Sequence, residues 1–271
     1  MKALVDLDLV VYRVGCACDN WYYEYNGVEY ESSKLLKSYL KRETGDDVMA
    51  AEMYNQAIKK RKPEAWEDVR DSVVSFVEDL IEPYQEYEGY ITGKGNFRFE
   101  IATILPYKGN RDDSVRPFYY DEIRQLLVDA YGAKMSEGME ADDCLGLASK
   151  SGTIILSVDK DLDQIPGWHY NWERDKKYFI TEQEGAKVFY KQMLTGDMTD
   201  NILGLYGVGP KSALLSNIDK MDDEVEIRYY IKQQYESRFG AYGIPFLLEN
   251  AKLLWVLQER ENPFTWEDYW K

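Results

Sequence analysis

The segment that decides the fold class is EADDCLGLASKSGTIILSVDKD, residues 140–161. Three acids open the segment, and from Glu140 onward apolar side chains recur at helical spacing, among them Ala141, Leu145 and Ala148. The apolar run Thr153–Ser157 follows and is typical of a short buried strand, and two further acids come directly after it. A helix that leads into a buried strand is the repeating unit of a doubly wound sheet. The segment therefore predicts an α/β fold with a mostly parallel sheet.

The same alternation extends toward both ends of the chain. A first strand is predicted at Lys2–Leu7, and Trp21–Glu31 is typical of a hairpin whose tyrosines pack within it. Proline marks the start of two helices, at Pro63 and Pro117, and a second strand region lies between them at about 90–103. The final third, from about residue 184, is predicted to be helical.

Composition limits the chemistry that the 271-residue chain can perform. A hydrophobic content of 45% excludes disorder, and acids interrupt the apolar N-terminus, which predicts a cytoplasmic protein with neither a signal peptide nor a membrane span. The three cysteines lack CxxC spacing and are interpreted as reduced structural thiols. The single histidine, His169, excludes His-based zinc chemistry and the usual Ser-His triad. Carboxylates remain as ligands, and they suit hard cations such as Mg²⁺ or Mn²⁺.

Acidic residues gather at four places where such a sheet concentrates function. Two end the first strand and leave the same face if the chain stays extended, three crowd a helix start, and two follow the strand at 153–157. The last two are three residues apart, which places them on one side of a helical turn. Each pair alone is equally typical of a solvated surface. Together they predict one metal site with these ligands: Asp6, Asp8, Glu140, Asp142, Asp143, Asp159, Asp161, Asp197 and Asp200.

Two further segments are suited to phosphate. Gly207 and Gly209 form a hinge that lets backbone N–H groups approach a phosphate, with a helix predicted from Pro210 and a cation at Lys211. In the second segment, Lys108 and Arg111 are one helical turn apart and can neutralise one phosphate, Tyr107 offers a ring to a terminal base, and Arg116 adds a cation. Plain turns explain either segment in isolation. The basic run at 59–62 is interpreted as a helix end and a secondary DNA contact.

The formal net charge of −16 opposes a nucleic-acid partner, since phosphate binding normally appears as a basic balance. The acids of a metal site account for part of this charge. Local basic patches would have to bind DNA, and binding is expected to be salt-sensitive and weak without divalent metal.

Taken in order, the motifs resemble those of the 5′ nuclease family, which includes flap endonucleases, the 5′ domain of bacterial DNA polymerases and phage 5′-3′ exonucleases. The matching motifs extend from Ala3 to about Ile218, and the compact size is most similar to the phage members. They are Val-Asp near the N-terminus, Tyr-Lys-Gly-Asn-Arg, Glu-Ala-Asp-Asp, Asp-Lys-Asp, Gly-Asp-x-x-Asp-Asn and Gly-x-x-Gly-x-Gly-x-Lys-x-Ala.

The resemblance implies a PIN-like catalytic domain over 1–183 with helices on both faces of its sheet and a helical arch at about 106–138. It implies a helical DNA-binding region over 184–271 with a helix-three-turn-helix motif at about 194–218. The implied activity is hydrolysis of phosphodiester bonds at or near DNA 5′ ends, as a 5′-3′ exonuclease, a flap endonuclease or both, in phage DNA replication or host DNA breakdown. The resemblance also implies two or three Mg²⁺ or Mn²⁺ ions at the active site and K⁺ at the helix-three-turn-helix. The expected substrate is DNA with a 5′ end, a flap or a single-strand/duplex junction, and the protein is expected to be a monomer.

One position departs from the family pattern. Members of the family carry another aspartate at the end of the second strand, where this chain has Thr92 and Gly93. Asp8 is the candidate to replace it. Two alternatives follow from this departure and from the acidic sheet: a catalytically weakened DNA-junction-binding protein of the same fold, and a PIN-type ribonuclease, which leaves the glycine hinge unexplained.

Overall fold

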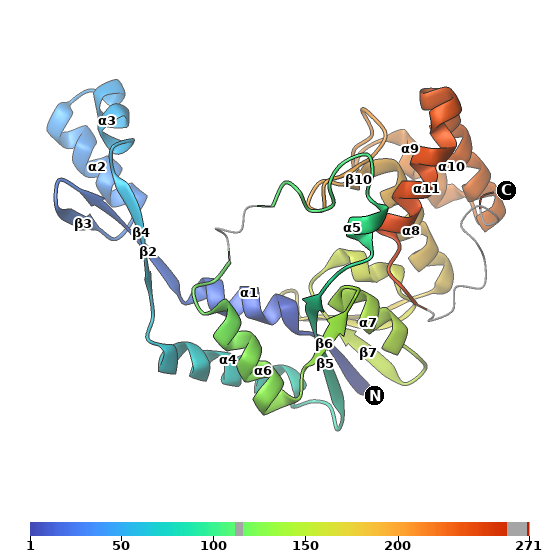
Figure 1. Cartoon of the computed structure of the whole chain (residues 1–271), viewed down its shortest axis with the longest axis horizontal. Helices are drawn as coiled ribbons and strands as arrows, with labels where there is room; N and C mark the ends of the chain where they lie inside the picture. The colour runs from blue at the N-terminus through green and yellow to red at the C-terminus, as the bar shows by residue number, and fades with distance from the viewer. Residues whose placement is uncertain (112–115, 259–269, 271) are drawn as a thin grey trace. The chain divides into compact units, whose positions relative to one another are not determined.

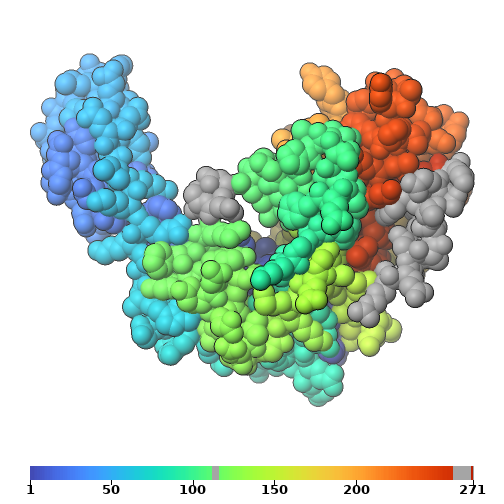
Figure 2. All heavy atoms as spheres, viewed as in Figure 1, coloured from blue at the N-terminus to red at the C-terminus, as the bar shows by residue number. Residues whose placement is uncertain are grey.

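The computed structural model describes residues 1–111, 116–258 and 270, drawn in colour in Figures 1 and 2. The chain divides into two compact units. Unit 1 consists of residues 1–9, 80–115 and 127–271, and unit 2 of residues 10–79 and 116–126. The domain boundary predicted at residues 183/184 falls inside unit 1.

Unit 1 is built on a six-stranded sheet in the order β6-β5-β1-β7-β8-β9. All neighbours are parallel except β8 and β9, which form an antiparallel pair that the sequence pattern did not predict. The chain passes from β1 to β5 and β6 on one side and then returns to β7 and β8 on the other side of β1. The topological switch point therefore lies at the carboxyl ends of β1 and β7. The strands are β1 Lys2–Asp6, β5 Tyr87–Lys94, β6 Lys134–Glu137, β7 Thr153–Leu156, β8 Gly167–Asn171 and β9 Lys176–Ile180.

Burial of the central strands confirms the mostly parallel α/β class. Every residue of β7 is buried, as expected for a parallel strand covered on both faces. Helix α7 (Ala141–Ala148) packs Leu145 against Leu4 of β1 and Ile155 of β7, and the short α5 (Arg98–Ile101) and the 3-10 helix η2 (Lys160–Gln164) follow β5 and β7. The predicted arch interval of about 106–138 includes β6, which belongs to the sheet, and residues 112–115, which lie outside the described residues.

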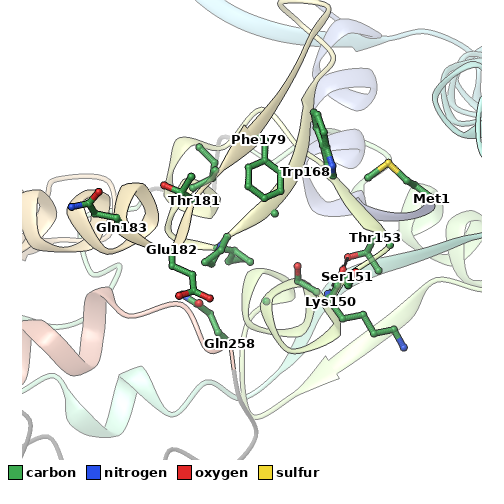
Figure 3. Close-up of a pocket in the computed structure, with 17 residues that line it drawn as sticks. Met1, Lys150, Ser151, Thr153, Trp168, Phe179, Thr181, Glu182, Gln183 and Gln258 are labelled. Carbon is green, nitrogen blue, oxygen red and sulfur yellow. Dashed lines mark hydrogen bonds between the residues drawn. The ribbon is translucent and has the colours of Figure 1, made fainter. Parts of the chain in front are cut away.

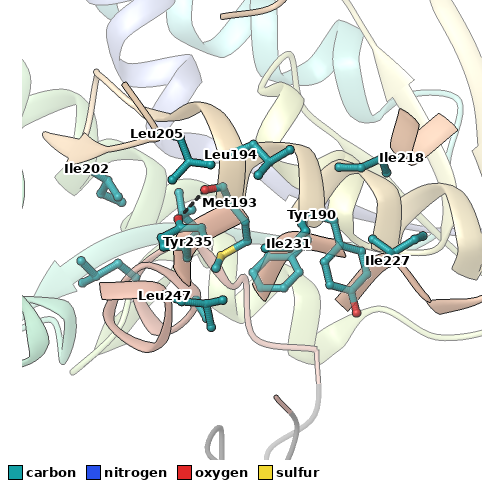
Figure 4. Close-up of a cluster of buried hydrophobic side chains, with 14 of the residues drawn as sticks. Tyr190, Met193, Leu194, Ile202, Leu205, Ile218, Ile227, Ile231, Tyr235 and Leu247 are labelled. Atoms are coloured by element: carbon teal, nitrogen blue, oxygen red, sulfur yellow. Dashed lines mark hydrogen bonds between the residues drawn. The ribbon is translucent and has the colours of Figure 1, made fainter. Parts of the chain in front are cut away.

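The C-terminal part of unit 1 is helical, as predicted (Figure 1). Its apolar cluster places Tyr190 and Met193 among residues of the following helices, and the Tyr235 hydroxyl donates a hydrogen bond to the Met193 carbonyl (Figure 4). None of the helices in the described residues is long and apolar enough to cross a membrane. The elements are α8 Glu182–Thr195, β10 Gly196–Asp197, β11 Ile202–Leu203, α9 Ala213–Lys220, α10 Glu224–Phe239, η3 Gly240–Tyr242 and α11 Gly243–Leu254.

Unit 2 contains a three-stranded antiparallel sheet in the order β3-β2-β4. The predicted hairpin is present, and Asn26 and Gly27 both have positive φ, as a tight two-residue turn requires. The basic run at 59–62 belongs to β4 and does not end a helix, so that prediction was wrong. The elements are α1 Leu7–Ala17, β2 Asp19–Tyr25, β3 Val28–Tyr30, α2 Ser33–Thr44, α3 Asp47–Tyr54, β4 Ile58–Pro63, α4 Trp66–Ile81 and α6 Tyr120–Tyr131; α1, α4 and α6 each extend into unit 1 at one end.

Candidate functional site

The carboxyl ends of four parallel strands meet at one edge of the sheet, and three of them deliver acidic side chains there. Asp6 ends β1, and Thr92 lies near the end of β5. The chain after β6 reaches Glu140 at the start of α7, and the chain after β7 reaches Asp159 at the start of η2. The topology therefore gathers motifs that lie up to 153 residues apart in the sequence.

Asp6, which is buried, and Asp142, which is half-buried, form the centre of this group. The Ser157 hydroxyl donates to Asp6 Oδ2 at 2.9 Å, and the Leu9 N–H donates to Oδ1 at 3.3 Å. Burial, followed by the negative charge of Asp8, raises the pKa of Asp6 to about 7. Burial and the charges of Asp6 and Asp159 raise the pKa of Asp142 well above its usual range. These carboxylates thus share one region of low polarity and repel one another.

The prediction that Asp8 leaves an extended strand beside Asp6 was wrong. Helix α1 begins at Leu7 and places Asp8 in its first turn. Its Oδ2 instead accepts a hydrogen bond from the Thr92 N–H at 2.9 Å. The Asp8 carboxylate therefore lies beside the position at which the family pattern has its additional aspartate. The Thr92 hydroxyl accepts from the Ala141 N–H at 3.0 Å, at the first position of α7.

Gly93 has no room for a side chain. A Cβ at this position would lie 2.0 Å from the Ser136 carbonyl oxygen in the neighbouring strand β6. The Gly93 N–H also donates to the Ser136 hydroxyl at 3.0 Å. The position that lacks the expected carboxylate is thus one where this fold needs close contact between two backbones.

We expect Gly93→Ala to lower the free energy of unfolding by about 1–3 kcal/mol, the usual cost of overpacking, because the clash is with backbone. Thermal denaturation would measure the change. Gly209→Ala is the matched control, since a Cβ there meets nothing within 4 Å. Equal melting temperatures for the two variants would contradict the steric explanation.

Asp159 and Asp161 lie at the start of η2. Asp159 caps it by accepting from the Asp161 N–H at 2.9 Å, and Asp161 Oδ1 accepts from the Gln192 amide of α8 at 2.6 Å. Burial, then the charges of Asp159 and Asp197, raises the pKa of Asp161 to about 8. Burial and the charges of Asp197 and Asp200 raise the pKa of Asp159. The acids after β7 and those near residue 200 therefore belong to one electrostatic group.

Asp197 and Asp200 do not share a helical turn, contrary to the prediction. Helix α8 ends at Thr195, Asp197 lies in the short strand β10, and its Oδ1 accepts from the Thr199 N–H at 2.7 Å. A second segment holds the end of this turn in place, because the Lys108 N–H donates to the Asp200 carbonyl at 2.9 Å. A non-helical turn thus brings the two acids beside the Tyr-Lys-Gly-Asn-Arg motif.

Lys108 and Arg111 are both held by acids of the site. Lys108 pairs with Glu140, and Arg111 pairs with Asp200. The backbone of Lys108 has a φ of 55°, a conformation uncommon outside glycine, and its carbonyl accepts from the Arg111 N–H at 3.1 Å. This turn directs both cations toward the carboxylates, where a phosphate could join them.

Tyr107 is 4% exposed, so its ring cannot stack on a base, and that prediction was wrong. The ring packs edge-on against Phe99, with 5.6 Å between centroids. Its hydroxyl donates to Asp200 at 2.6 Å and lies 3.0 Å from Glu140 Oε2. Burial and these two negative charges raise the Tyr107 pKa, which keeps the hydroxyl protonated as a donor between the two acids.

Asp143 was predicted to be a metal ligand, but its carboxylate is bound by Arg98. The guanidinium donates to both of its oxygens, at 2.6 and 2.9 Å. The Leu257 N–H also donates to Asp143 at 3.0 Å, and Asp143 is fully buried. Burial lowers the Arg98 pKa, but the hydrogen bonds and charge of Asp143 outweigh that effect and raise it overall. Sequence reasoning missed Arg98 because a lone arginine on a short helix carries no motif.

A pocket of about 30 Å³, close to the volume of one water, lies at the centre of these groups. Among the described residues, no group of three or more acidic, cysteine or histidine side chains is spaced to hold a metal ion as it stands. The donor set nevertheless fits Mg²⁺ or Mn²⁺, because it consists of carboxylate oxygens. Burial and the neighbouring negative charges raise the pKa values of Asp142 and Asp161, and a bound cation would offset both effects. The pocket is lined by Glu140, Asp142, Asp161, Asp197 and Asp200, together with Arg98, Tyr107, Gln192 and four apolar residues.

A larger pocket of about 950 Å³ lies at the opposite, amino ends of β7 and β8 (Figure 3). Its walls include the exposed aromatic pair Trp168 and Phe179. Glu182 is its single acid, so this pocket cannot supply the several carboxylates of a metal centre.

The residues predicted to bind DNA outside this site are placed in two regions. Gly207 has a φ of 74°, and side-chain positions at Gly207 and Gly209 face open space, which leaves their backbones accessible. The helix after this hinge begins at Ala213 with Ser212 as its cap, so the predicted start at Pro210 was three residues early. Lys211 is exposed just before that cap. Arg116 lies in unit 2, where its guanidinium lies 5.1 Å from the Tyr120 ring centroid.

Comparison with known proteins supports the resemblance drawn from the motifs. No protein-family model matches the chain. Its sequence is 36% identical over 115 residues to DNA polymerase I of Rhizobium leguminosarum, covering 36% of this chain and 11% of that protein. It is 32% identical over 164 residues to DNA polymerase I of Bacillus subtilis, covering 49% of this chain and 18% of that protein. The chain thus spans less than a fifth of the length of these relatives.

The fold is one that a solved flap endonuclease also has. More particularly, it is similar to a crystal structure of the bacteriophage T5 flap endonuclease in a pseudo-enzyme-product complex with DNA and metal ions, with a TM-score of 0.55 and 20% identity over 93% of this chain and 88% of that one. A structure of the T5 protein co-crystallised with metal ions has a TM-score of 0.53 and 17% identity, again over 93% of this chain and 88% of that one. The predicted fold class is confirmed, including the helices that flank the sheet and the helical C-terminal region.

Proposed function

We propose that this chain is a metal-dependent 5′ nuclease that hydrolyses phosphodiester bonds at or near DNA 5′ ends. The observation that carries the proposal is the convergence of acids from separate segments at the switch point of the sheet, beside Lys108 and Arg111. The relatives named DNA polymerase I and the flap-endonuclease fold support the same reading. A cytoplasmic monomer acting in phage replication or host DNA breakdown fits it.

Two or three Mg²⁺ or Mn²⁺ ions would be held directly or through water by the acids of the site. Bound there, they would supply charge neutralisation and activation of water for attack on phosphorus. Asp143 is omitted from the proposed ligands because Arg98 occupies it. The proposed ligands are Asp6, Asp8, Glu140, Asp142, Asp159, Asp161, Asp197 and Asp200.

The remaining side chains position and neutralise the substrate. Lys108 and Arg111 would exchange part of their contact with Glu140 and Asp200 for oxygens of the scissile phosphate, and so offset charge that develops in the transition state. The buried Tyr107 hydroxyl keeps Glu140 and Asp200 in place during that exchange. The hinge at Gly207 and Gly209, with Lys211, would hold a duplex phosphate, with K⁺ as a candidate counter-ion.

Cleavage assays test the proposal directly. Purified protein is incubated with 5′-labelled flap, blunt-duplex and single-stranded DNA, and with matched RNA, in Mg²⁺, in Mn²⁺ and in EDTA. Metal-dependent cleavage near the DNA 5′ end is expected, and the products on the flap and the duplex divide endonuclease from exonuclease activity. Tight binding to DNA without cleavage in either metal would favour the junction-binding alternative, whereas preferential cleavage of RNA would favour a PIN-type ribonuclease.

A further inference from the structure

One surface of unit 2 combines a run of cations with exposed aromatic rings. Strand β4 contributes four consecutive cations, Lys59, Lys60, Arg61 and Lys62, in a chain whose formal net charge is −16. The strand lies at the edge of the three-stranded sheet, where it pairs with β2 alone among the described strands. Glu24 and Asp19 of β2 compensate two of these cations, Lys60 and Arg61. The run keeps two positive charges beyond these pairs, in contrast to the chain as a whole.

Trp21 of β2 stands among these cations. It pairs with Arg61 across the ladder and is 38% exposed. The Lys59 ammonium lies 4.2 Å and the Arg61 guanidinium 4.8 Å from the centroid of its ring. The apolar cluster of this sheet gathers around Tyr25, Leu36 and Leu40 and does not include Trp21. A large ring is thus presented to solvent between two positive charges.

A second segment of unit 2 extends the same surface. The Arg61 guanidinium donates to the Arg116 carbonyl at 3.0 Å, and the Phe118 N–H donates to Asp19 Oδ2 at 3.0 Å. Asp19 lies 3.7 Å from Arg61, and its side chain is only 5% exposed, so its charge is compensated. These bonds fix an exposed cation, Arg116, and a ring that is 53% exposed, Phe118, beside the ladder of β2 and β4.

We propose that this surface, formed by Trp21, Lys59, Arg61, Lys62, Arg116 and Phe118, binds single-stranded DNA. Cations that track a phosphate backbone beside exposed rings are the chemistry by which unpaired nucleotides are held, since each unpaired base offers a face for stacking. Duplex DNA hides those faces within its own stack. Lysines on an edge strand also prevent edge-to-edge pairing, but that role does not require exposed rings beside them. The inference rests on the proposed nuclease function and assigns the single-stranded arm of its substrate to unit 2.

Binding is measured on the full chain by fluorescence anisotropy in EDTA, with a labelled single-stranded oligonucleotide and a blunt duplex of the same sequence. We expect Trp21→Ala to weaken single-strand binding by about 5- to 100-fold, the usual effect of losing one stacked base, and Trp21→Phe to retain most of it. The double variant Lys59→Glu/Lys62→Glu should reduce the slope of log affinity against log salt by about 1.4, or about 0.7 for each lost phosphate contact.

Lys34→Glu/Lys37→Glu, which reverses two exposed lysines of α2 in the same unit, is the control for net charge. Circular dichroism confirms that each variant is folded. The inference is overturned if the control weakens single-strand binding as much as Lys59→Glu/Lys62→Glu does, or if Trp21→Ala weakens duplex binding equally. Cleavage by the unaltered chain is scored separately. If the unaltered chain cleaves DNA but the variants bind single strands as well as it does, only this inference is refuted. If the variants lose single-strand binding but the unaltered chain does not cleave DNA, only the nuclease proposal is refuted.

Discussion

Asp159→Asn is expected to reduce metal-dependent cleavage on the order of 1000-fold or more while leaving the protein folded. Asp159 is one of the acids whose charge acts on Asp142 and Asp161, so the substitution removes a proposed metal ligand from this acidic group. A metal ion contributes several kcal/mol of transition-state stabilisation, and each 1.36 kcal/mol corresponds to a factor of ten in rate. Initial rates on a 5′-labelled substrate in Mg²⁺ and Mn²⁺ measure the effect.

The fold should tolerate this change for two reasons. Asparagine retains the oxygen that accepts from the Asp161 N–H, and it removes a charge whose burial beside Asp197 and Asp200 raises the pKa and therefore opposes folding. The melting temperature in EDTA should not fall. Asp163→Asn is the matched control in the same 3-10 helix, since Asp163 accepts a hydrogen bond from the Tyr178 hydroxyl and is not among the main charges that raise the pKa of Asp142 or Asp161. Undiminished cleavage by Asp159→Asn would refute the assignment of the metal site.

The sequence predicted the parts of this site that local patterns encode. Burial of the run at 153–157 and the turn chemistry of Asn26-Gly27 follow from neighbouring residues, and both were confirmed. Acids after a buried strand point to the carboxyl edge of a sheet whatever the rest of the chain does. This is why Asp6, Glu140 and Asp159 could be grouped from sequence although they are far apart along the chain.

The roles of individual acids depended on contacts that no local pattern contains. Asp142 and Asp143 are adjacent and identical in type, yet one faces the acidic group and the other is bound by Arg98, 45 residues away. A period-two pattern placed Asp8 on a strand because it did not treat Asp6 as a helix cap, although Asp6 Oδ1 accepts from the Leu9 N–H in the first turn of α1. Strand β4 was hidden because a run of four cations has no apolar alternation to indicate a strand.

Arg98→Met is expected to lower the free energy of unfolding by about 3–5 kcal/mol, because it would leave the fully buried Asp143 carboxylate without its cation. The guanidinium also donates to the carbonyls of Leu253 at 2.9 Å and Trp255 at 2.7 Å. One side chain thus joins the start of α7 to the end of α11, across the boundary that sequence reasoning placed at residues 183/184. Chemical denaturation followed by circular dichroism measures the loss.

A surface pair provides the comparison that separates burial from charge. Arg70 contacts Asp71 at 2.8 Å with both side chains about half exposed or more, so Arg70→Met should cost less than about 1 kcal/mol. If Arg98→Met cost no more than Arg70→Met, the buried pair would not be holding α7 in place. If Arg98→Met lowers the free energy of unfolding by the expected amount, Arg98 serves the candidate site as a positioning residue. It anchors Asp143, and Glu140 and Asp142 lie at the same start of α7. Residual cleavage in Arg98→Met should then fall with the folded fraction and be restored toward the original rate by Arg98→Lys, which keeps a buried cation beside Asp143.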